Sequence, residues 1–227
     1  MLSELRHALR ARIVHGLWLF GLPRCVRIFY IRAWRLRRHL DDSFSLGGAT
    51  KPRELVPLLK AAGDSDLAVE LGTGTGWTTI ALALARPTRR VITIDLVHHP
   101  QRDRYASLVD QTVRNRIQWL ERDGEQDPAD IEEVGFLFID AAHDEASTLR
   151  QFQAWRPHLA PNAVVAFHDF NDPRWPGVTQ AIRRLGLRGL ARDHLFVWRA
   201  DGQIRPVYRV CGAGTGRHRT APGRPNT

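Results

Sequence analysis

The chain has 227 residues, of which 43% are hydrophobic, and this predicts one globular domain with an added arm. Its two cysteines, Cys25 and Cys211, lie far apart and fit no metal-binding or disulfide spacing. The apolar stretches are too short for a membrane span, and arginines interrupt the apolar N-terminal region, so that no secretory signal is evident. We therefore expect a reduced, cytoplasmic setting.

The net charge of +9 comes almost entirely from arginine, and many of these arginines lie in the first forty residues. They are Arg6, Arg10, Arg12, Arg24, Arg27, Arg32, Arg35, Arg37 and Arg38. Aromatic residues are interleaved with them: Trp18, Phe20, Phe29, Tyr30 and Trp34. Such an arm suits packing on the folded domain as a cover or dimer contact, binding to an anionic membrane surface, or binding to nucleic acid phosphates. We favour the first role and place the membrane surface second.

The arm is expected to form helices near residues 3–20 and 23–39, followed by a loop over residues 41–50. Pro52, a residue favoured in the first helical turn, predicts a helix that continues to about residue 62. The end of the chain is rich in glycine, proline and arginine, which predicts disorder. The expected parts are a basic helical arm over 1–50, a folded domain over 51–210 and a disordered tail over 211–227.

A buried strand over residues 67–71 leads into a glycine-rich turn and then a helix. Glu70 stands near the end of this strand. Three glycines at alternate positions allow a tight turn that no side chain obstructs: Gly72, Gly74 and Gly76. Helical spacing begins at Trp77, so a strand, a turn and a helix N-terminus form a cradle of the nucleotide-binding type.

The spacing of this motif is E-x-G-x-G-x-G, whereas a dinucleotide-binding turn needs a third glycine where Trp77 stands. A carboxylate at the strand end suits a ligand with an ammonium or sulfonium group. The motif resembles the first motif of class I S-adenosylmethionine-dependent methyltransferases, which implies this methyl donor as cofactor. The residues that the resemblance places beside the donor are Glu70, Gly72, Thr73, Gly74, Gly76 and Thr78. A packing or capping role suits Thr78 equally well.

Two further acidic residues follow the next two strands. Asp95 ends a strand run about 20 residues after the glycines, where an acid accepts hydrogen bonds from both ribose hydroxyls. Asp123 follows a third strand over residues 117–120, and in the methyltransferases that the chain resembles an acid there receives the adenine amino group. The simpler interpretations are a helix N-cap for Asp95 and a turn aspartate for Asp123.

The rest of the chain continues the alternation of strands and helices. Strands are expected at 135–140 and 163–168, and helices at 145–155 and 176–185. Asp201-Gly202 is a strong hairpin signal between strands at 194–200 and 203–210. The predicted fold is an α/β, Rossmann-like open sheet of seven mostly parallel strands, with helices on both faces and a C-terminal antiparallel hairpin.

Polar side chains follow the fourth and fifth strands, at the edge where open parallel sheets bind ligands. The fourth strand ends in Asp140, with His143 three residues further on, and the fifth delivers His168 and Asp169. If the two strands are neighbours, these four side chains converge beside the methyl donor.

The segments F-I-D-x-x-H and H-D-F resemble bacterial O-methyltransferases that act on sugars and other small metabolites, and more distantly the catechol O-methyltransferase group. The similarity covers about residues 50–200. It implies a magnesium ion held by Asp140 and Asp169, with His168 in the remaining place, and Asp140 also lies beside the donor. Two features depart from the pattern. Pro161-Asn162-Ala163 replaces the usual Pro-Gly-Gly. The place of His168 is often an acid in this family, and imidazole is a poor ligand for a hard cation.

Methyl transfer from a sulfonium is an in-line displacement, so the protein must align the acceptor and remove its proton. A cation on the acceptor oxygen lowers its pKa, and a nearby imidazole takes the proton. The resemblance places the general base at His143, with His168 as the second candidate. Structural roles stay open: a helix-start residue for His143, and an N-cap or turn acid for Asp169. Arg174 and Trp175 suit the wall of an acceptor pocket.

The predicted function is methyl transfer to a hydroxyl group of a small molecule, with a saccharide favoured over a phenolic natural product. A nucleic acid methyltransferase would account for the charge, but residues 140–143 lack the prolines and the aromatic residue that amino-directed enzymes place there. The other alternative is a non-catalytic donor-binding or membrane-associated protein, and the polar strand ends argue against it. A homodimer, and a peripheral membrane contact through the arm, also stay open.

Overall fold

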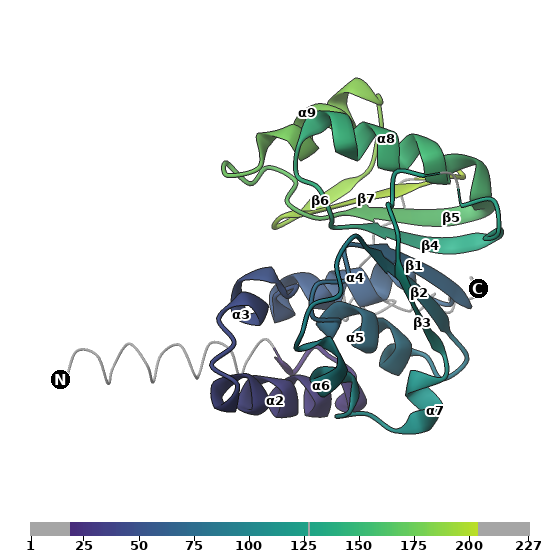
Figure 1. Ribbon diagram of the computed structural model, residues 1–227. Helices are drawn as coiled ribbons and strands as arrows, with labels where there is room; N and C mark the ends of the chain where they lie inside the picture. The colour runs from purple at the N-terminus through teal and green to yellow at the C-terminus, as the bar shows by residue number, and fades with distance from the viewer. Residues whose placement is uncertain (1–18, 127, 204–227) are drawn as a thin grey trace, which may run out of the picture.

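The computed structural model describes residues 19–126 and 128–203, which form a seven-stranded sheet between helices (Figure 1). The strands are β1 (Leu67–Leu71), β2 (Arg90–Asp95), β3 (Ile117–Glu121), β4 (Val134–Ile139), β5 (Leu159–Phe167), β6 (Leu190–Arg192) and β7 (Leu195–Arg199). Their order is β3-β2-β1-β4-β5-β7-β6. β7 runs antiparallel to both β5 and β6, and the other neighbouring strands of the sheet are parallel. The strand order reverses between β1 and β4, which places a ligand-binding crevice beyond their carboxyl ends.

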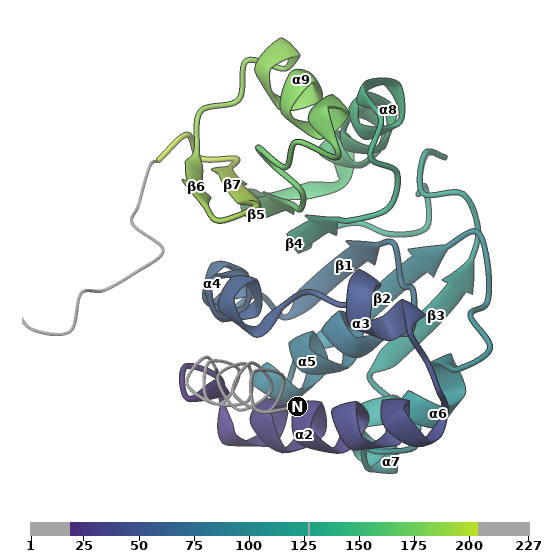
Figure 2. The ribbon, with the colours of Figure 1, turned by 90° about the vertical axis from the view of Figure 1, so that its left-hand side faces the viewer.

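Helices cover both faces of the sheet (Figures 1 and 2). One face carries α8 (Glu145–Trp155) and α9 (Pro176–Arg184). The other face carries α4 (Pro52–Ala62) and α5 (Trp77–Ala85), and α2 (Arg24–His39) packs outside α5. Short helical segments complete the chain: α3 (Phe44–Gly48), α6 (Arg102–Ala106), α7 (Gln111–Arg114) and the 3-10 turn η1 (Arg156–His158).

Alternating side chains of the strands fill two separate cores. In β4, Phe136 and Phe138 face the core formed with α4 and α5, whereas Leu137 and Ile139 face the core formed with α8 and α9. The central strands are therefore apolar on both sides, which explains why they read in the sequence as nearly continuous apolar runs.

An aromatic cluster around Trp77 holds α2 in place. Phe29 and Tyr30 lie on the inner face of α2, with ring centroids 6.4 and 5.4 Å from that of Trp77. The Tyr105 ring of α6 lies 5.2 Å from the same indole. All four residues belong to one buried core, so α2 packs on the folded domain, the first of the roles expected for the arm. Within the described residues, no helix combines the length and the apolar character needed to cross a bilayer.

The predicted fold class is confirmed, and the differences concern short segments. A hairpin joins β6 and β7 through a turn at Asp193-His194, which the sequence did not reveal. Asp201-Gly202 also forms a turn, in which the Gly202 amide donates to the Arg199 carbonyl at 3.1 Å, but the strand predicted after it lies almost entirely outside the described residues. Asp193 has a φ of 52°, a left-handed conformation that aspartate tolerates better than most residues. Residues 44–48, expected in a loop, form α3. The first arm helix, the last predicted strand and the tail lie essentially outside the described residues.

Backbone hydrogen bonds join the ends of four strands into one row. The amides of Gly72, Asp140 and His168 donate to carbonyls at the ends of β2, β1 and β4, at N···O distances of 2.8, 2.8 and 3.0 Å. Each of these three residues directly follows the last residue of its own strand. The glycine turn and the polar residues of the fourth and fifth strands are thereby placed side by side.

Gly72 makes the closest backbone approach in this row. It has a φ of 95°, and a Cβ atom added to it would lie 2.1 Å from the carbonyl oxygen of Asp140. Real Cβ atoms do not approach an oxygen so closely, so the turn after β1 requires glycine here on two counts.

A Gly72→Ala substitution tests how far the structure depends on this approach. The added methyl group would collide with the Asp140 carbonyl while the backbone stayed at positive φ, so we expect at least ~3 kcal/mol loss in the free energy of unfolding. Urea unfolding followed by circular dichroism measures the loss. Gly186→Ala is the matched control: Gly186 has a φ of 64° and open space around it. We expect the control to lose only about 1 kcal/mol, and equal losses would contradict the steric explanation.

Candidate active site

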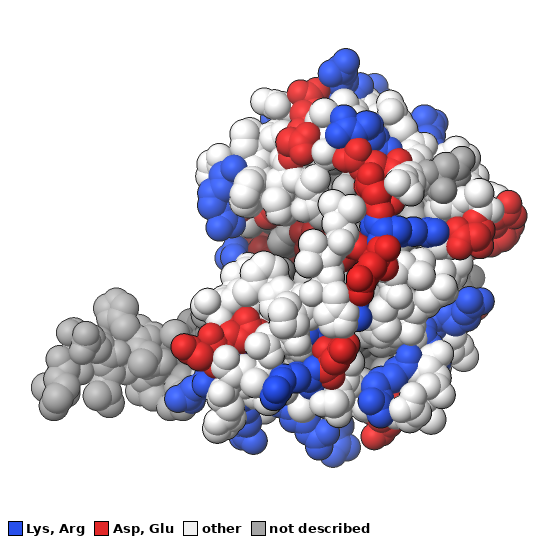
Figure 3. Space-filling model, viewed as in Figure 1, with Lys and Arg blue, Asp and Glu red and all other residues white. Residues whose placement is uncertain are grey.

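A cavity of about 710 Å³ lies at the carboxyl edge of the parallel strands. Figure 3 shows a hollow on this side of the molecule, between α3 and the layer of α8 and α9, with acidic atoms visible inside it. The cavity wall includes every residue that the sequence predicted for the site: Glu70, Gly72, Thr73, Gly74, Gly76, Thr78, Asp95, Asp123, Asp140, His143, His168 and Asp169. Arg174 and Trp175 line it as well.

Glu70 lies beneath the glycine turn. Its Oε2 accepts hydrogen bonds from the hydroxyl groups of Thr93, at 2.8 Å, and of Thr79. Burial raises the pKa of Glu70 to about 8, although these two hydrogen bonds act to lower it. Because Thr93 belongs to β2 and Thr79 to α5, Glu70 links the end of β1 to both elements. It also places a titratable carboxyl group in the wall of the cavity.

Asp95 and Asp123 shape the turns that carry them. Asp95 Oδ2 accepts a hydrogen bond from the Gly74 amide at 2.9 Å, and its Oδ1 accepts one from the Val97 amide at 3.3 Å. Asp123 Oδ1 accepts a hydrogen bond from the Glu125 amide at 2.9 Å. Both residues also line the cavity. Each of them therefore stabilises a turn and also lies where it can contact a ligand.

The short helix α3 lies over the glycine turn and adds to the cavity wall. The Ser45 hydroxyl donates to Asp42 at 2.6 Å, and Ser45 Oγ lies 2.6 Å from Thr75 Oγ1 in the turn. Phe44 lines the cavity and stacks on His99, with a centroid distance of 4.4 Å. Neither the contact of Ser45 with Thr75 nor the stacking of Phe44 on His99 was predicted, because the sequence indicated only a loop over these residues.

His143 and Asp169 form a pair in the cavity wall. His143 Nδ1 lies 3.0 Å from Asp169 Oδ2, and this hydrogen bond raises the pKa of His143. Burial acts to raise the pKa of Asp169, but hydrogen bonds from His143 and His168 hold it well below its usual range. The Trp175 ring packs against the His143 imidazole at 4.4 Å. The imidazole is thus oriented by its Nδ1, which leaves Nε2 for proton transfer.

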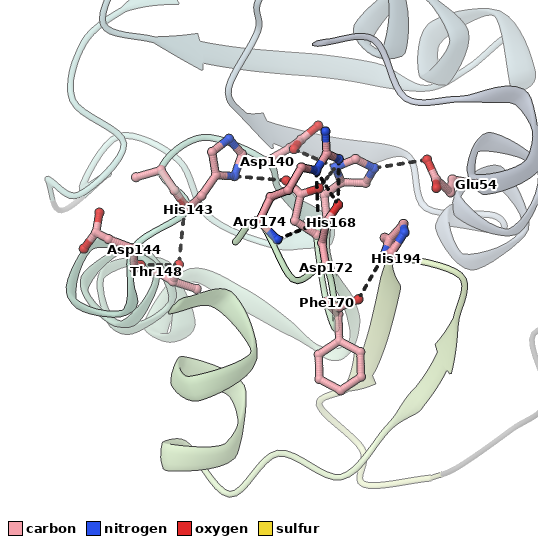
Figure 4. Close-up of polar contacts among 12 residues, drawn as sticks. Glu54, Asp140, His143, Asp144, Thr148, His168, Phe170, Asp172, Arg174 and His194 are labelled. Carbon is pink, nitrogen blue, oxygen red and sulfur yellow. Dashed lines mark hydrogen bonds and ion pairs between the residues drawn. The ribbon is translucent and has the colours of Figure 1, made fainter. Parts of the chain in front are cut away.

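His168 lies among three carboxylates. Its Nδ1 is 3.0 Å from Asp140 Oδ1 and 3.4 Å from Asp169 Oδ1, and its Nε2 is 3.4 Å from Glu54 Oε2 (Figure 4). Burial lowers the pKa of His168, but the three carboxylates raise it more, so it lies well above the ordinary value. The charged imidazolium is therefore the favoured form of this residue.

Glu54, in the first turn of α4, is a site residue that the sequence did not reveal. It is 1% exposed and lines the cavity, and its Oε1 makes no hydrogen bond within the described residues, although Arg53 Nε lies 3.4 Å away. The one available signal was its place one turn before Leu58 on an otherwise apolar face of the helix. Gln151 of α8 also lines the cavity, and its buried Oε1 likewise lacks a partner in the described structure.

A group of three potential metal ligands lies in the same wall. Asp140, His143 and Asp169 each offer a ligand atom, and these atoms lie within 4.8 Å of one another. The predicted set contained His168 in place of His143. Carboxylate oxygens suit a hard divalent cation, whereas a protonated His168 has no lone pair to offer. The two aspartates therefore fit such a cation, and His168 fits it only after losing its proton.

Comparison with known proteins agrees with this architecture. Residues 69–170 match the model of a family described as a methyltransferase domain. No curated protein sequence matches the chain significantly. The chain therefore contains a methyltransferase domain, and its sheet order and glycine turn agree with the predicted class I S-adenosylmethionine-dependent type.

Solved structures of methyltransferases have a similar fold at low sequence identity. The S-adenosylhomocysteine-bound methyltransferase PaMTH1 of Podospora anserina is 14% identical, with a TM-score of 0.59 over 83% of this chain and 95% of that one. TomG, an O-methyltransferase of Streptomyces achromogenes involved in tomaymycin synthesis, is 20% identical, with a TM-score of 0.51 over 72% and 76%. CalS11, a TDP-rhamnose 3'-O-methyltransferase of calicheamicin biosynthesis, is 18% identical, with a TM-score of 0.51 over 71% and 85%.

Glu70→Gln tests the pH dependence that burial of this carboxyl group predicts. Folding raises the pKa of Glu70 from about 4.5 to about 8, so between these pH values the folded state binds a proton that the unfolded state has lost. The resulting stabilisation is complete below the lower value and disappears as the pH rises through the higher one. The free energy of unfolding of the wild type, relative to the variant, should fall by up to ~1.4 kcal/mol per pH unit across this range. Urea unfolding without donor measures it, and parallel pH curves would contradict it.

Proposed function

We propose that the protein transfers the methyl group of S-adenosylmethionine to a hydroxyl group of a small molecule, and that this acceptor is a saccharide. The observation that carries the proposal is the His143–Asp169 pair, with its 3.0 Å contact, in the same cavity as the glycine turn. A base that is oriented by an acid, beside a donor site, is what transfer to an alcohol requires.

The donor is assigned to the half of the cavity formed by β1, β2 and the turn after β3. In this assignment the donor contacts Glu70, Gly72, Thr73, Gly74, Gly76, Thr78, Asp95, Asp123 and Asp140, all of which line the cavity. A cationic donor beside Glu70 favours the carboxylate, so donor binding lowers the pKa of Glu70 from its raised value. The unobstructed backbone of the glycine turn leaves room for the donor to approach closely.

The acceptor hydroxyl is assigned to the side of the cavity that carries His143. The Nδ1–H group of His143 donates to Asp169, so Nε2 accepts the hydroxyl proton while the acceptor oxygen bonds to the methyl carbon. The carbon–sulfur bond breaks, and its electron pair stays on sulfur as the neutral thioether. Asp169 stabilises the imidazolium that His143 becomes, and His168 is the second candidate for the base.

Asp140 and Asp169 are the residues that would hold a divalent cation, with His168 as a third ligand in its neutral form. A bound cation would lower the pKa of an acceptor hydroxyl that it contacts. The two aspartates provide the oxygen atoms that magnesium prefers, and both line the cavity.

A saccharide acceptor is supported by buried oxygen atoms that lack partners. Gln151 Oε1 accepts no hydrogen bond within the described residues, Glu54 Oε1 has only the ion pair with Arg53 at 3.4 Å, and both side chains line the cavity. Leaving buried acceptors unpaired is costly, so the site favours a ligand with several hydroxyl donors. CalS11, whose fold is similar, is a methyltransferase of a nucleotide-linked sugar, which agrees with this acceptor class.

A donor-consumption screen identifies the acceptor class. Oligosaccharides, nucleotide-linked sugars and phenols are offered with S-adenosylmethionine and magnesium, and formation of S-adenosylhomocysteine is measured by mass spectrometry. We expect turnover with a member of the saccharide set. Turnover with phenols alone would overturn the saccharide assignment, and failure to bind S-adenosylmethionine in calorimetry would overturn the donor assignment.

His143→Ala tests the general base with the acceptor found in that screen. We expect kcat to fall about 100- to 10,000-fold, because the acceptor keeps its proton, while the dissociation constant for the donor stays within about twofold. Steady-state kinetics and calorimetric titration measure the two effects. His98→Ala is the matched control, since His98 lies on the loop after β2 and contacts Glu121 rather than the cavity acids. Wild-type turnover by the His143 variant would remove the base assignment.

Removal of metal ions tests the cation separately. After treatment with EDTA and dialysis, we expect the rate to fall at least about tenfold and to return when magnesium is added. Donor affinity, measured by calorimetry before and after treatment, should not change. A full rate in the metal-free protein would remove the cation from the proposal and leave His143 as the sole agent that activates the acceptor.

A further inference from the structure

The helix α2 has two faces of opposite character. Its inner face carries Val26, Phe29, Tyr30 and Ala33, which are buried against the core around Trp77. Its 16 residues include six arginines and no acidic residue. Since the inner face is apolar, the charge of α2 lies mainly on the remaining surface of the helix.

The outer face of α2 is a stripe of two isoleucines with arginines on either side. It consists of Arg24, Ile28, Ile31, Arg35 and Arg38, all exposed and spaced four or three residues apart. This spacing places them on one side of an α-helix, along about 20 Å of its length. Ile28 and Ile31, which are 40% and 38% exposed, occupy the middle of the stripe, between the arginines.

Exposed aromatic rings flank this outer face. Phe20, which is 74% exposed, lies 5.8 Å from the Arg27 guanidinium carbon, and Trp34, which is 38% exposed, lies 5.5 Å from that of Arg38. In Figure 3, basic side chains gather along the lower edge of the molecule, where Figure 1 shows α2 from the same side. A surface with aromatic, aliphatic and cationic groups together is typical of helices that lie at a lipid–water interface.

We propose that the outer face of α2 docks on an anionic lipid surface, with Ile28 and Ile31 entering the headgroup region and the arginines contacting lipid phosphates. Nucleic acid would use the arginines but would give no favourable environment to two exposed isoleucines in the centre of the site. A lipid interface accommodates both kinds of residue. No residue of α2 is among those that line the cavity, so docking leaves the active site open.

Vesicle flotation tests this surface with the full-length protein. The vesicles contain phosphatidylcholine alone or with roughly one third phosphatidylglycerol, in about 0.1 M sodium chloride. We expect the wild type to float with the anionic vesicles and not with the neutral ones. Substituting Arg24, Arg35 and Arg38 by glutamine should weaken binding about 100-fold, at about fivefold for each arginine. Ile28→Ser combined with Ile31→Ser should weaken it about tenfold.

A charge-matched control separates position from net charge. Substituting Arg183, Arg184 and Arg188 by glutamine removes three exposed arginines from the α9 region, on the opposite side of the sheet. This control should bind the anionic vesicles as the wild type does. Donor affinity and the melting temperature should be the same in all variants, since every substituted side chain is exposed.

Three results would overturn the proposal. They are no flotation of the wild type with anionic vesicles, equal loss of binding in the α2 and α9 arginine variants, and wild-type binding by the double isoleucine variant. A single-stranded RNA that displaces the protein from the vesicles, with the double isoleucine variant bound to it as tightly as the wild type, would assign the surface to nucleic acid instead. None of these results depends on methyl transfer, so the docking surface and the proposed reaction are tested independently.

Discussion

The row of backbone hydrogen bonds at the carboxyl edge of the sheet is the constraint on which the site depends. It joins the amides of Gly72, Asp140 and His168 to the ends of the neighbouring strands. Because Gly72 has no side chain, the turn after β1 can approach the carbonyl of Asp140 more closely than any Cβ atom would permit. The glycine turn and the acids that follow β4 and β5 are therefore set at a fixed separation by the backbone.

This close arrangement places several carboxylates near one another, and two histidines offset their negative charge. Glu54, Asp140 and Asp169 surround His168, and Asp169 also pairs with His143. The directions of the pKa changes follow from this arrangement: both imidazoles gain affinity for protons, and Asp169 loses it. Such a cluster is suited to proton transfer, since its paired members lie within 3.0 to 3.4 Å of one another and shift each other's pKa values.

The position of the cavity could be predicted from the sequence because most of the residues that line it stand directly after strands, and these strands are easy to recognise as apolar runs. Asp140 and Asp169 stand at or just beyond the ends of apolar runs, and such strands meet at one edge whatever their exact register. Glu54 and Phe44 were missed for the opposite reason. Each enters the site through tertiary packing of a helix, and a glutamate in the first turn of α4 is as ordinary on a surface as it is in a site. The hairpin between β6 and β7 was missed because β6 has only three residues, too few to give a strand pattern in the sequence, and it forms by pairing with β7.

Trp77 connects the donor turn with the basic arm. In a dinucleotide-binding turn this position needs glycine to let the helix approach the sheet, whereas here its indole fills the space between α5, α2 and α6. The same substitution that excludes the dinucleotide motif therefore creates the docking point for the inner face of α2. Once that face is buried around Trp77, the periodicity of the helix leaves Arg24, Ile28, Ile31, Arg35 and Arg38 on the outside. The exposed basic stripe is thus a geometric consequence of how the arm packs against the first residue after the glycine turn.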